Sequence, residues 1–254
     1  MIDAPDPSDA DLAGRLATDA VLLLESLRAQ MEGQDVDAVR NAGDRRSHEF
    51  LMAAFAAHRP GDAVLSEEGV DDPVRLTADR VWIVDPLDGT REFGEGRSDW
   101  AVHVALWTAA ADDVVLGAVG LPGGVTLTSD PAPFTPSPSA GAPRVVASRT
   151  RAPAVVEVVV DALDGVMVPL GSAGAKIAAV VRGDAEAYVH AGGMWEWDSA
   201  APVAVARAAG VIATRLDGSP LRYNQPHPYL PDLIVARADL AEQVLAAARS
   251  AAGT

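Results

Sequence analysis

Apolar side chains recur every three or four residues over the N-terminal stretch, which indicates amphipathic helices. We expect the first helix to begin after Ser8, a good N-cap residue, and to run to about Met31. A second helix is predicted from Asp44, at its head, to Arg59. The apolar positions that define the buried faces of these two helices are Leu12, Leu16, Leu23, Leu27, Phe50, Leu51, Ala54 and Phe55.

Short apolar runs rich in Val follow, and their length predicts strands. Asp62–Leu65 and Val81–Val84 each lead into acidic residues, and three further apolar runs suggest an antiparallel meander over residues 101–128. Residues 130–143 hold five prolines and are typical of a linker or a long surface loop. Beyond them, strands are predicted at 145–148, 165–170, 186–190, 211–214 and 233–236, and helices at 152–163, 173–182, 198–209 and 240–248.

The length of the chain sets its organisation. It has 254 residues, of which 49% are hydrophobic, so it can bury a substantial core as one large domain or two packed halves. We expect an N-terminal α+β half over residues 1–140 and a C-terminal α/β half over residues 141–254. No stretch approaches the ~20 apolar residues of a membrane span. Residues 1–6 lack the features of a signal peptide, so we expect a cytoplasmic protein.

Charge and cysteine content exclude several classes of partner and chemistry. The net charge of −16 argues against nucleic-acid polymers and anionic membranes as partners. A small phosphate ester remains compatible, because bound cations reverse the local field. The absence of cysteine excludes disulfides, thiolate metal sites and cysteine nucleophiles. The five histidines show no spacing typical of metal ligands, and we interpret them as ordinary surface or core residues.

The stretch Val81–Thr90 carries the strongest chemical indication in the chain. Asp85 and Asp88 stand three residues apart at the end of a buried strand, where ligands commonly bind in α/β sheets. Two carboxylates held this close repel each other unless a cation lies between them. Gly89 permits close backbone approach, and the Thr90 hydroxyl and nearby amides can hold an oxyanion. The stretch therefore indicates a metal and phosphate site, although Asp-Pro and Asp-Gly pairs also favour surface turns.

Three other acidic positions strengthen the metal interpretation. Glu67, followed by Glu68, ends the strand that starts at Asp62, and Asp44 lies further upstream. Asp198 lies far downstream, where the Trp195–Pro202 stretch opens an alanine-rich helix. Taken singly, Asp44 and Asp198 are more often helix caps, and adjacent glutamates are usually a solvated pair.

Taken together and in this order, these motifs resemble those of the inositol monophosphatase family of metal-dependent phosphatases. The family pattern has an upstream Asp, an acidic pair, D-P-x-D-G-T and W-D-x-A, which here span Asp44 to Ala201. The resemblance implies a five-layer αβαβα sandwich of the inositol monophosphatase and fructose-1,6-bisphosphatase type. Haloacid dehalogenase-type phosphatases use D-x-D-x-T, with acids two residues apart on one side of the chain. The spacing of Asp85 and Asp88 excludes that class and its phospho-aspartate intermediate.

The resemblance also implies a set of metal ligands and catalytic groups. Two or three Mg²⁺ ions are expected, with Mn²⁺ as a substitute, because the donors are all oxygen atoms. Asp85 would bridge two ions, Asp44 would help hold a weaker third, and Glu67 and Thr90 would orient a metal-activated water. The implied metal ligands are Glu67, Asp85, the Leu87 carbonyl, Asp88, Asp198 and Asp44, and the implied catalytic residues are Glu67, Thr90 and Asp44.

Within the family, the chain is most similar to the CysQ-type 3'-phosphoadenosine 5'-phosphate phosphatases. Arg91–Phe93 after the threonine, Gly171–Lys176 and the late Gly218–Asn224 segment carry this resemblance. Lys176 is the only lysine in the chain, and we expect it to face an anionic group of the substrate. The implied substrate-binding residues are Gly89, Thr90, Ser172, Lys176 and Asp198.

Three functions follow as hypotheses. The leading one is a Mg²⁺-dependent, Li⁺-inhibited phosphatase that removes the 3'-phosphate of adenosine 3',5'-bisphosphate in sulfate assimilation, as a homodimer. The second keeps the site and changes the substrate to inositol monophosphate or fructose 1,6-bisphosphate. The third is a non-catalytic protein that binds nucleotide or metal. Asp44, Glu67, Asp85, Asp88, Asp198 and Thr90 are all present, which argues against the third.

Overall fold

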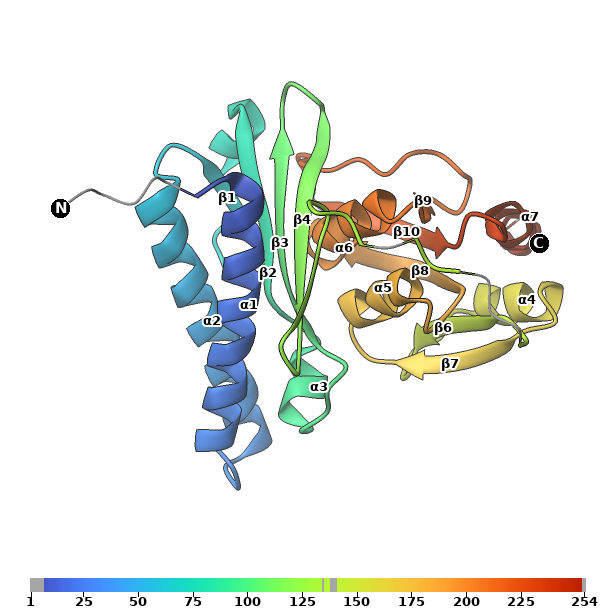
Figure 1. The fold of residues 1–254 in the computed structure, drawn as a ribbon, viewed down its shortest axis with the longest axis horizontal. Coiled ribbons are helices and arrows are strands. Elements are labelled where there is room, and N and C mark those ends of the chain that lie inside the picture. Colours follow the sequence, from blue (N-terminus) through green and yellow to red (C-terminus); the bar gives the residue numbers. More distant parts are fainter. Residues whose placement is uncertain (1–6, 134, 138–140, 253–254) are drawn as a thin grey trace.

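The chain folds into five layers that alternate between helices and sheets (Figure 1). The computed structural model describes residues 7–133, 135–137 and 141–252. Helices α1 (Asp9–Gln30) and α2 (Val36–His58) form one outer layer. A first sheet, the helices α5 (Ala173–Arg182) and α6 (Glu196–Ala208), a second sheet and a final helical layer follow. This arrangement confirms the αβαβα sandwich implied by the family motifs.

The first sheet has the order β1-β2-β3-β4-β5. Strand β1 runs parallel to β2, and β3 to β5 form the antiparallel meander that the apolar runs over residues 101–128 predicted. Strand β2, which was not part of that prediction, extends the meander by pairing antiparallel with β3. The strands are β1 (Ala63–Ser66), β2 (Arg80–Asp88), β3 (Ala101–Thr108), β4 (Asp113–Leu121) and β5 (Val125–Thr128). Because β1 and β2 run in the same direction, Glu67 and the Asp85–Asp88 stretch emerge at the same edge of the sheet.

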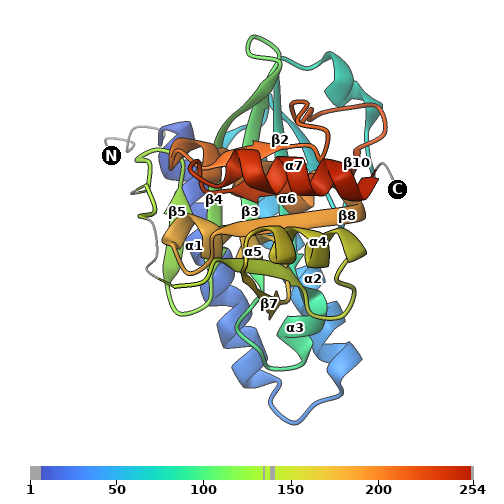
Figure 2. The ribbon, with the colours of Figure 1, turned by 90° about the vertical axis from the view of Figure 1, so that its right-hand side faces the viewer.

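The second sheet has the order β7-β6-β8-β10-β9. Strand β6 runs parallel to β7 and β8, whereas β10 is antiparallel to both β8 and β9. Figure 2 shows α4 (Ala154–Ala162) and α7 (Ala241–Ala252) covering its outer face. The strands are β6 (Arg144–Ser148), β7 (Val166–Leu170), β8 (Ala187–Trp195), β9 (Ile212–Thr214) and β10 (Tyr229–Ala236).

Each helical layer is joined to its sheet by a separate apolar core. One cluster packs α1 and α2 on the first sheet, where Phe55 and Trp82 are in ring contact at 5.0 Å. A second fills the space around α5 and α6 between the two sheets, and a third lies under α4 and α7. The strands β2 and β3 are buried on both faces, so polar groups at their ends are fixed by a rigid scaffold.

Several sequence expectations need correction. Asp44 was expected at the head of its helix, but α2 begins at Val36, because the Asp35 side chain caps it by accepting from Asp37 N and Ala38 N. Strands β8 and β10 extend beyond the predicted 186–190 and 233–236, because they pair with each other over their whole length. The 3₁₀ helix η1 (Pro73–Thr77) and the short helix α3 (Thr90–Gly94) were not predicted, since neither has an apolar period.

The proline-rich segment is described only in part. Residues 134 and 138–140, including Pro138 and the predicted boundary between the halves, lie outside the described residues. That boundary stays a prediction. Among the described ranges, none of the helices is both long enough and apolar enough to cross a membrane.

Candidate functional site

Three carboxylates from different parts of the chain converge at one edge of the first sheet. Asp85 and Asp88 end β2, and Asp198 lies in the first turn of α6. One oxygen from each lies within 4.8 Å of the other two. Asp85 is 1% and Asp88 8% exposed, so water screens their mutual repulsion poorly. Buried acids this close are the donor set that a divalent cation requires.

Local backbone irregularity at the end of β2 places the two aspartates. The pairing of β2 with β3 shifts register between Asp85 and Asp88, and the Asp85 carboxylate accepts from Leu87 N at 3.0 Å. The sequence predicted a strand that ends at Val84, directly before Asp85. The structure instead includes Asp85 within β2. Gly89 follows with a φ of +90°, and a Cβ there would lie 2.9 Å from the Ser172 Cβ. Glycine is required at this position on both grounds.

Asp88 is held by groups from two other elements. Its Oδ2 accepts from Gly174 N at 2.6 Å and its Oδ1 from Ala173 N at 3.3 Å, both in the first turn of α5. On its other side, His103 Nε2 of β3 lies 3.3 Å from Oδ2. The positive N-terminal end of α5 thus offsets part of the charge on Asp88.

His103 is a neighbour of the site that the sequence interpretation missed. It is fully buried, its Nδ1 lies 3.0 Å from the Trp197 carbonyl, and burial lowers its pKa. A Cβ at Gly174 would lie 2.1 Å from His103 Nε2, so this close approach needs glycine. The available signal was a polar residue inside the apolar run 101–107. The ring lies between Asp88 and the turn that carries Asp198.

Glu67 lies at the rim and is not part of the three-carboxylate cluster. Glu67 as a whole is exposed, whereas its carboxyl group is largely removed from solvent and is hydrogen-bonded to the carboxyl group of Asp85. Desolvation of that carboxyl group, with the charge of Asp88 adding to it, raises the pKa of Glu67 to about 7. Burial first, and then the charge of Glu67, raise the pKa of Asp85 well above its usual range. The site therefore concentrates negative charge that a cation would neutralise.

Thr90 and Asp44 form a second polar pair beside this cluster. The Thr90 hydroxyl lies 2.9 Å from Asp44 Oδ1 and 3.1 Å from the Leu87 carbonyl, which share its one proton. Asp44 lies in the middle of α2 and contacts Thr90 from there. Ser47 of the same helix donates to the Pro86 carbonyl at 2.6 Å, which holds α2 against the site. Burial raises the pKa of Asp44 to about 6, although the hydrogen bond from Thr90 opposes this.

Asp198 is the third residue of α6, and its side chain caps the start of that helix. Its Oδ2 accepts from Trp195 N at 2.7 Å. Burial, with the charge of Asp88 adding to it, raises the pKa of Asp198 to about 8. The indole rings of Trp195 and Trp197 stack at 5.3 Å with an interplanar angle of 13°. These contacts fix the turn that presents Asp198.

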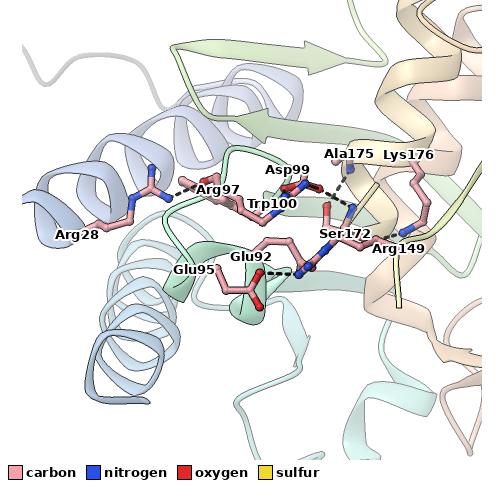
Figure 3. Close-up of polar contacts among 11 residues, drawn as sticks. Arg28, Glu92, Glu95, Arg97, Asp99, Trp100, Arg149, Ser172, Ala175 and Lys176 are labelled. Carbon is pink, nitrogen blue, oxygen red and sulfur yellow. Dashed lines mark hydrogen bonds and ion pairs between the residues drawn. The ribbon is translucent and has the colours of Figure 1, made fainter. Parts of the chain in front are cut away.

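A cavity of about 240 Å³ opens beside the carboxylates. Lys176 lines it while being 3% exposed, and its Nζ donates to the Gly171 carbonyl (Figure 3). The same Nζ lies 5.2 Å from the centre of the Tyr188 ring. Burial lowers the pKa of Lys176 to about 8, although nearby carboxylates oppose the shift. The Ser172 Oγ accepts from Ala175 N at 2.9 Å and so caps α5, which leaves its own proton available.

A neighbouring cavity of about 250 Å³ carries two arginines that the sequence interpretation also missed. Arg149 pairs with Glu92 and Glu95, each at 2.7 Å (Figure 3). Arg151 is exposed, and within the described ranges its guanidinium forms no ion pair. Gly89 and Gly171 line both cavities, so an extended anionic ligand can reach from the carboxylates towards these cations.

Comparisons with known proteins agree with this geometry. The model of the inositol monophosphatase family matches residues 10–252. The chain is 49% identical over 255 residues to the 3'-phosphoadenosine 5'-phosphate phosphatase of Mycobacterium leprae, covering 95% of this chain and 94% of that protein. It is 31% identical over 203 residues to the 3'(2'),5'-bisphosphate nucleotidase CysQ of Escherichia coli, covering 74% and 81%. The crystal structure of CysQ from Bacteroides thetaiotaomicron superposes with a TM-score of 0.77 at 27% identity, covering 90% and 97%.

Proposed function

Because the chain belongs to the inositol monophosphatase family and is a phosphatase of that family, we propose that it hydrolyses the 3'-phosphate of adenosine 3',5'-bisphosphate, giving AMP and phosphate. The observation that carries this proposal is the cluster of Asp85, Asp88 and Asp198 beside a cavity lined by Lys176. The cluster suits a metal at the reacting phosphate, and Lys176 suits a second anionic group. The names of the relatives at 49% and 31% identity support the same substrate.

The donor set fits Mg²⁺. Every candidate ligand is an oxygen atom, from Glu67, Asp85, Asp88 and Asp198 and from the Leu87 carbonyl. Hard cations prefer such ligands, and Mn²⁺ is expected to substitute. When bound, Mg²⁺ would polarise the phosphate oxygens and lower the pKa of a water molecule. We propose two or three ions, with Asp44 at the weakest position.

The chain's own groups orient the reactants. The Thr90 hydroxyl donates to Asp44, so its oxygen is free to accept from a water and orient it together with Glu67, and a proton leaving that water can pass through the hydroxyl to the Asp44 carboxylate. Gly89, which no Cβ shields, lets its backbone approach a phosphate oxygen. Lys176 places a positive charge where the remaining phosphate of a bisphosphate would lie. The aspartates of the cluster are assigned to holding the metal, so we propose direct attack by water with no covalent phosphoenzyme.

We predict that Thr90→Ala lowers kcat about 100-fold, since loss of a proton-transfer group commonly costs 10²–10⁴. Mg²⁺ affinity, measured by titration calorimetry, should remain close to that of the parent. Thr90→Ser keeps the hydroxyl and should retain most of the activity. If Mg²⁺ binding collapses in Thr90→Ala while Thr90→Ser is normal, Thr90 supports the metal site rather than the proton transfer.

The substrate is tested by Mg²⁺-dependent phosphate release from adenosine 3',5'-bisphosphate, inositol 1-phosphate and fructose 1,6-bisphosphate. We expect kcat/KM for the nucleotide to exceed that for the other two about tenfold or more, equivalent to about 1.4 kcal/mol. Higher efficiency with inositol or fructose ester would keep the chemistry and refute the nucleotide assignment. Absence of release from all three would refute the phosphatase proposal for these substrates and favour a binding protein.

Three expectations rest on family likeness alone. Inhibition by Li⁺, a homodimer and a place in cytoplasmic sulfate assimilation stay predictions. The first follows from competition with Mg²⁺ and is checked in the same phosphate-release assay. The second is checked by light scattering, where the mass of one 26.3 kDa chain would contradict it.

A further inference from the structure

Asp99 holds the turn that leads into α5 (Figure 3). It lies between α3 and β3, and its residue is 8% exposed. Its Oδ2 accepts from Gly171 N at 2.7 Å, and its backbone carbonyl accepts from Ser172 N at 3.0 Å. One residue thus binds both backbone N–H groups that precede the helix.

Asp99 is itself held firmly. The guanidinium of Arg97 binds both of its carboxylate oxygens, at 2.7 and 2.8 Å. Burial would raise the pKa of Asp99, but Arg97 and the amide of Gly171 outweigh it, so the pKa lies below the usual range. The Arg97 carbonyl accepts from Arg28 of α1 at 2.7 Å and from the Trp100 indole at 3.1 Å. The turn is therefore anchored, through Asp99, to the outer helical layer.

The turn that Asp99 holds carries two groups of the site. The Gly171 carbonyl accepts from Lys176 Nζ. The backbone N–H groups of Ala173 and Gly174, which directly follow residues 171 and 172, donate to the Asp88 carboxylate. A displacement of residues 171 and 172 would therefore move the ammonium group and remove hydrogen bonds from a carboxylate of the acidic cluster.

We propose that Asp99 is a positioning residue for this site. By holding Gly171 and Ser172, it sets where the Lys176 ammonium and the Asp88 carboxylate face the cavity. The part that concerns Lys176 and substrate rests on the proposed function. The part that concerns Asp88 does not, because the hydrogen bonds to Asp88 are independent of which phosphate ester binds.

The test compares Asp99→Ala and Asp99→Asn with the parent protein. Asp99→Ala loses both side-chain contacts, and we expect Mg²⁺ binding, measured by calorimetry without substrate, to weaken about tenfold. We expect KM for adenosine 3',5'-bisphosphate to rise by a similar factor, with a smaller change in kcat. Asp99→Asn can still accept from Gly171 N but cannot form an ion pair with Arg97. Its Mg²⁺ affinity and its KM should therefore lie between those of the parent and those of Asp99→Ala.

Asp62 provides a matched control at the opposite end of β1. It accepts from Arg80 Nε at 2.9 and 3.0 Å and from Trp82 Nε1 at 2.8 Å. Its side chain is 11% exposed, against 10% for Asp99. At ~3.3 Å per residue, it is roughly 16 Å along the chain from Glu67. Asp62→Ala should lower the melting temperature, as Asp99→Ala does, yet keep parental Mg²⁺ affinity and KM.

The outcomes separate a positioning role from a structural one. If the Mg²⁺ affinity and the KM of Asp99→Ala equal those of Asp62→Ala, the proposal is overturned. If Asp99→Ala does not fold, Arg97→Ala leaves Asp99 in place and removes the Arg97 side chain that holds it, which is 39% exposed. It should change both constants in the same direction, and parental constants would overturn the proposal. If the nucleotide proves not to be a substrate, the Mg²⁺ titration still tests Asp99, so the two failures are distinguishable.

Discussion

Asp85→Asn is expected to reduce kcat/KM for phosphate release about 1000-fold or more while making the metal-free protein more stable. Asp85 is 1% exposed and lies among the negative charges of Glu67, Asp88 and Asp198. Asn has the same size but no charge, so it weakens the proposed metal ligand and removes the repulsion between buried acids. Function and stability should therefore move in opposite directions, as expected where a site is built from mutually repelling groups.

The stability change depends on pH in a definite direction. The pKa of Asp85 is raised in the folded state, so its ionisation opposes folding above the usual pKa of an aspartate. At pH 7 to 8 without metal, the melting temperature of Asp85→Asn should exceed that of the parent by about 2 °C or more. The difference should disappear towards pH 3, because the carboxyl group is then protonated in both folded and unfolded states.

Thermal unfolding with and without Mg²⁺ completes this test. Mg²⁺ that binds only the folded state should raise the melting temperature of the parent in proportion to the logarithm of its concentration. Asp85→Asn should show little of this rise, whereas Asp62→Asn, an equal change at the other end of the sheet, should show all of it. Near-parental turnover in Asp85→Asn, or an undiminished response to Mg²⁺, would refute the metal site.

The sequence could predict the acidic residues of the site because they carry a local signature. Asp85, Asp88, Gly89 and Thr90 lie within six residues of each other, and Asp198 lies in its own short motif. The layered fold was a consequence of the family resemblance, since apolar periodicity located strands and helices but not the order of the layers. The wrong start of α2 has a local cause, because Asp35 is as good a helix cap as Asp44.

The groups that surround the acids could not be predicted because their partners are distant in sequence. His103 contacts the carbonyl of Trp197, 94 residues away, and Asp99 accepts from Gly171, 72 residues away. Neither residue lies in a recognisable motif, and both contacts exist only because α5 and α6 pack between the sheets. A sequence motif identifies the residues that contact a ligand. The residues that orient those ligand-contacting residues come from distant parts of the chain, and only the tertiary fold brings them together.

Lys176→Met should raise KM for adenosine 3',5'-bisphosphate about 10- to 100-fold, with a much smaller effect on inositol 1-phosphate. A hydrogen bond to a charged group contributes about 1.5–3 kcal/mol, and each 1.4 kcal/mol is a factor of ten in affinity. Met has a similar length and is apolar, so it suits the buried position that Lys176 occupies over the Tyr188 ring, and folding should be retained. Inositol 1-phosphate has no second phosphate to contact Lys176, so its KM should not depend on this residue.

The pH dependence of KM gives Lys176 a signature that packing alone would not produce. Its pKa is lowered to about 8, mainly by burial, so the ammonium loses its charge as pH rises through 8. In the parent, KM for the bisphosphate should rise above pH 8, whereas in Lys176→Met it should stay high and flat. Arg182→Met, on the exposed end of the same helix where Arg182 pairs with Asp184 at 2.9 Å, should behave as the parent. If Lys176→Met retains the parental KM and pH profile, Lys176 serves packing against Tyr188, and the second phosphate must be bound elsewhere. Arg91 and Arg151, which are both exposed and line the adjoining cavity, are then the candidates.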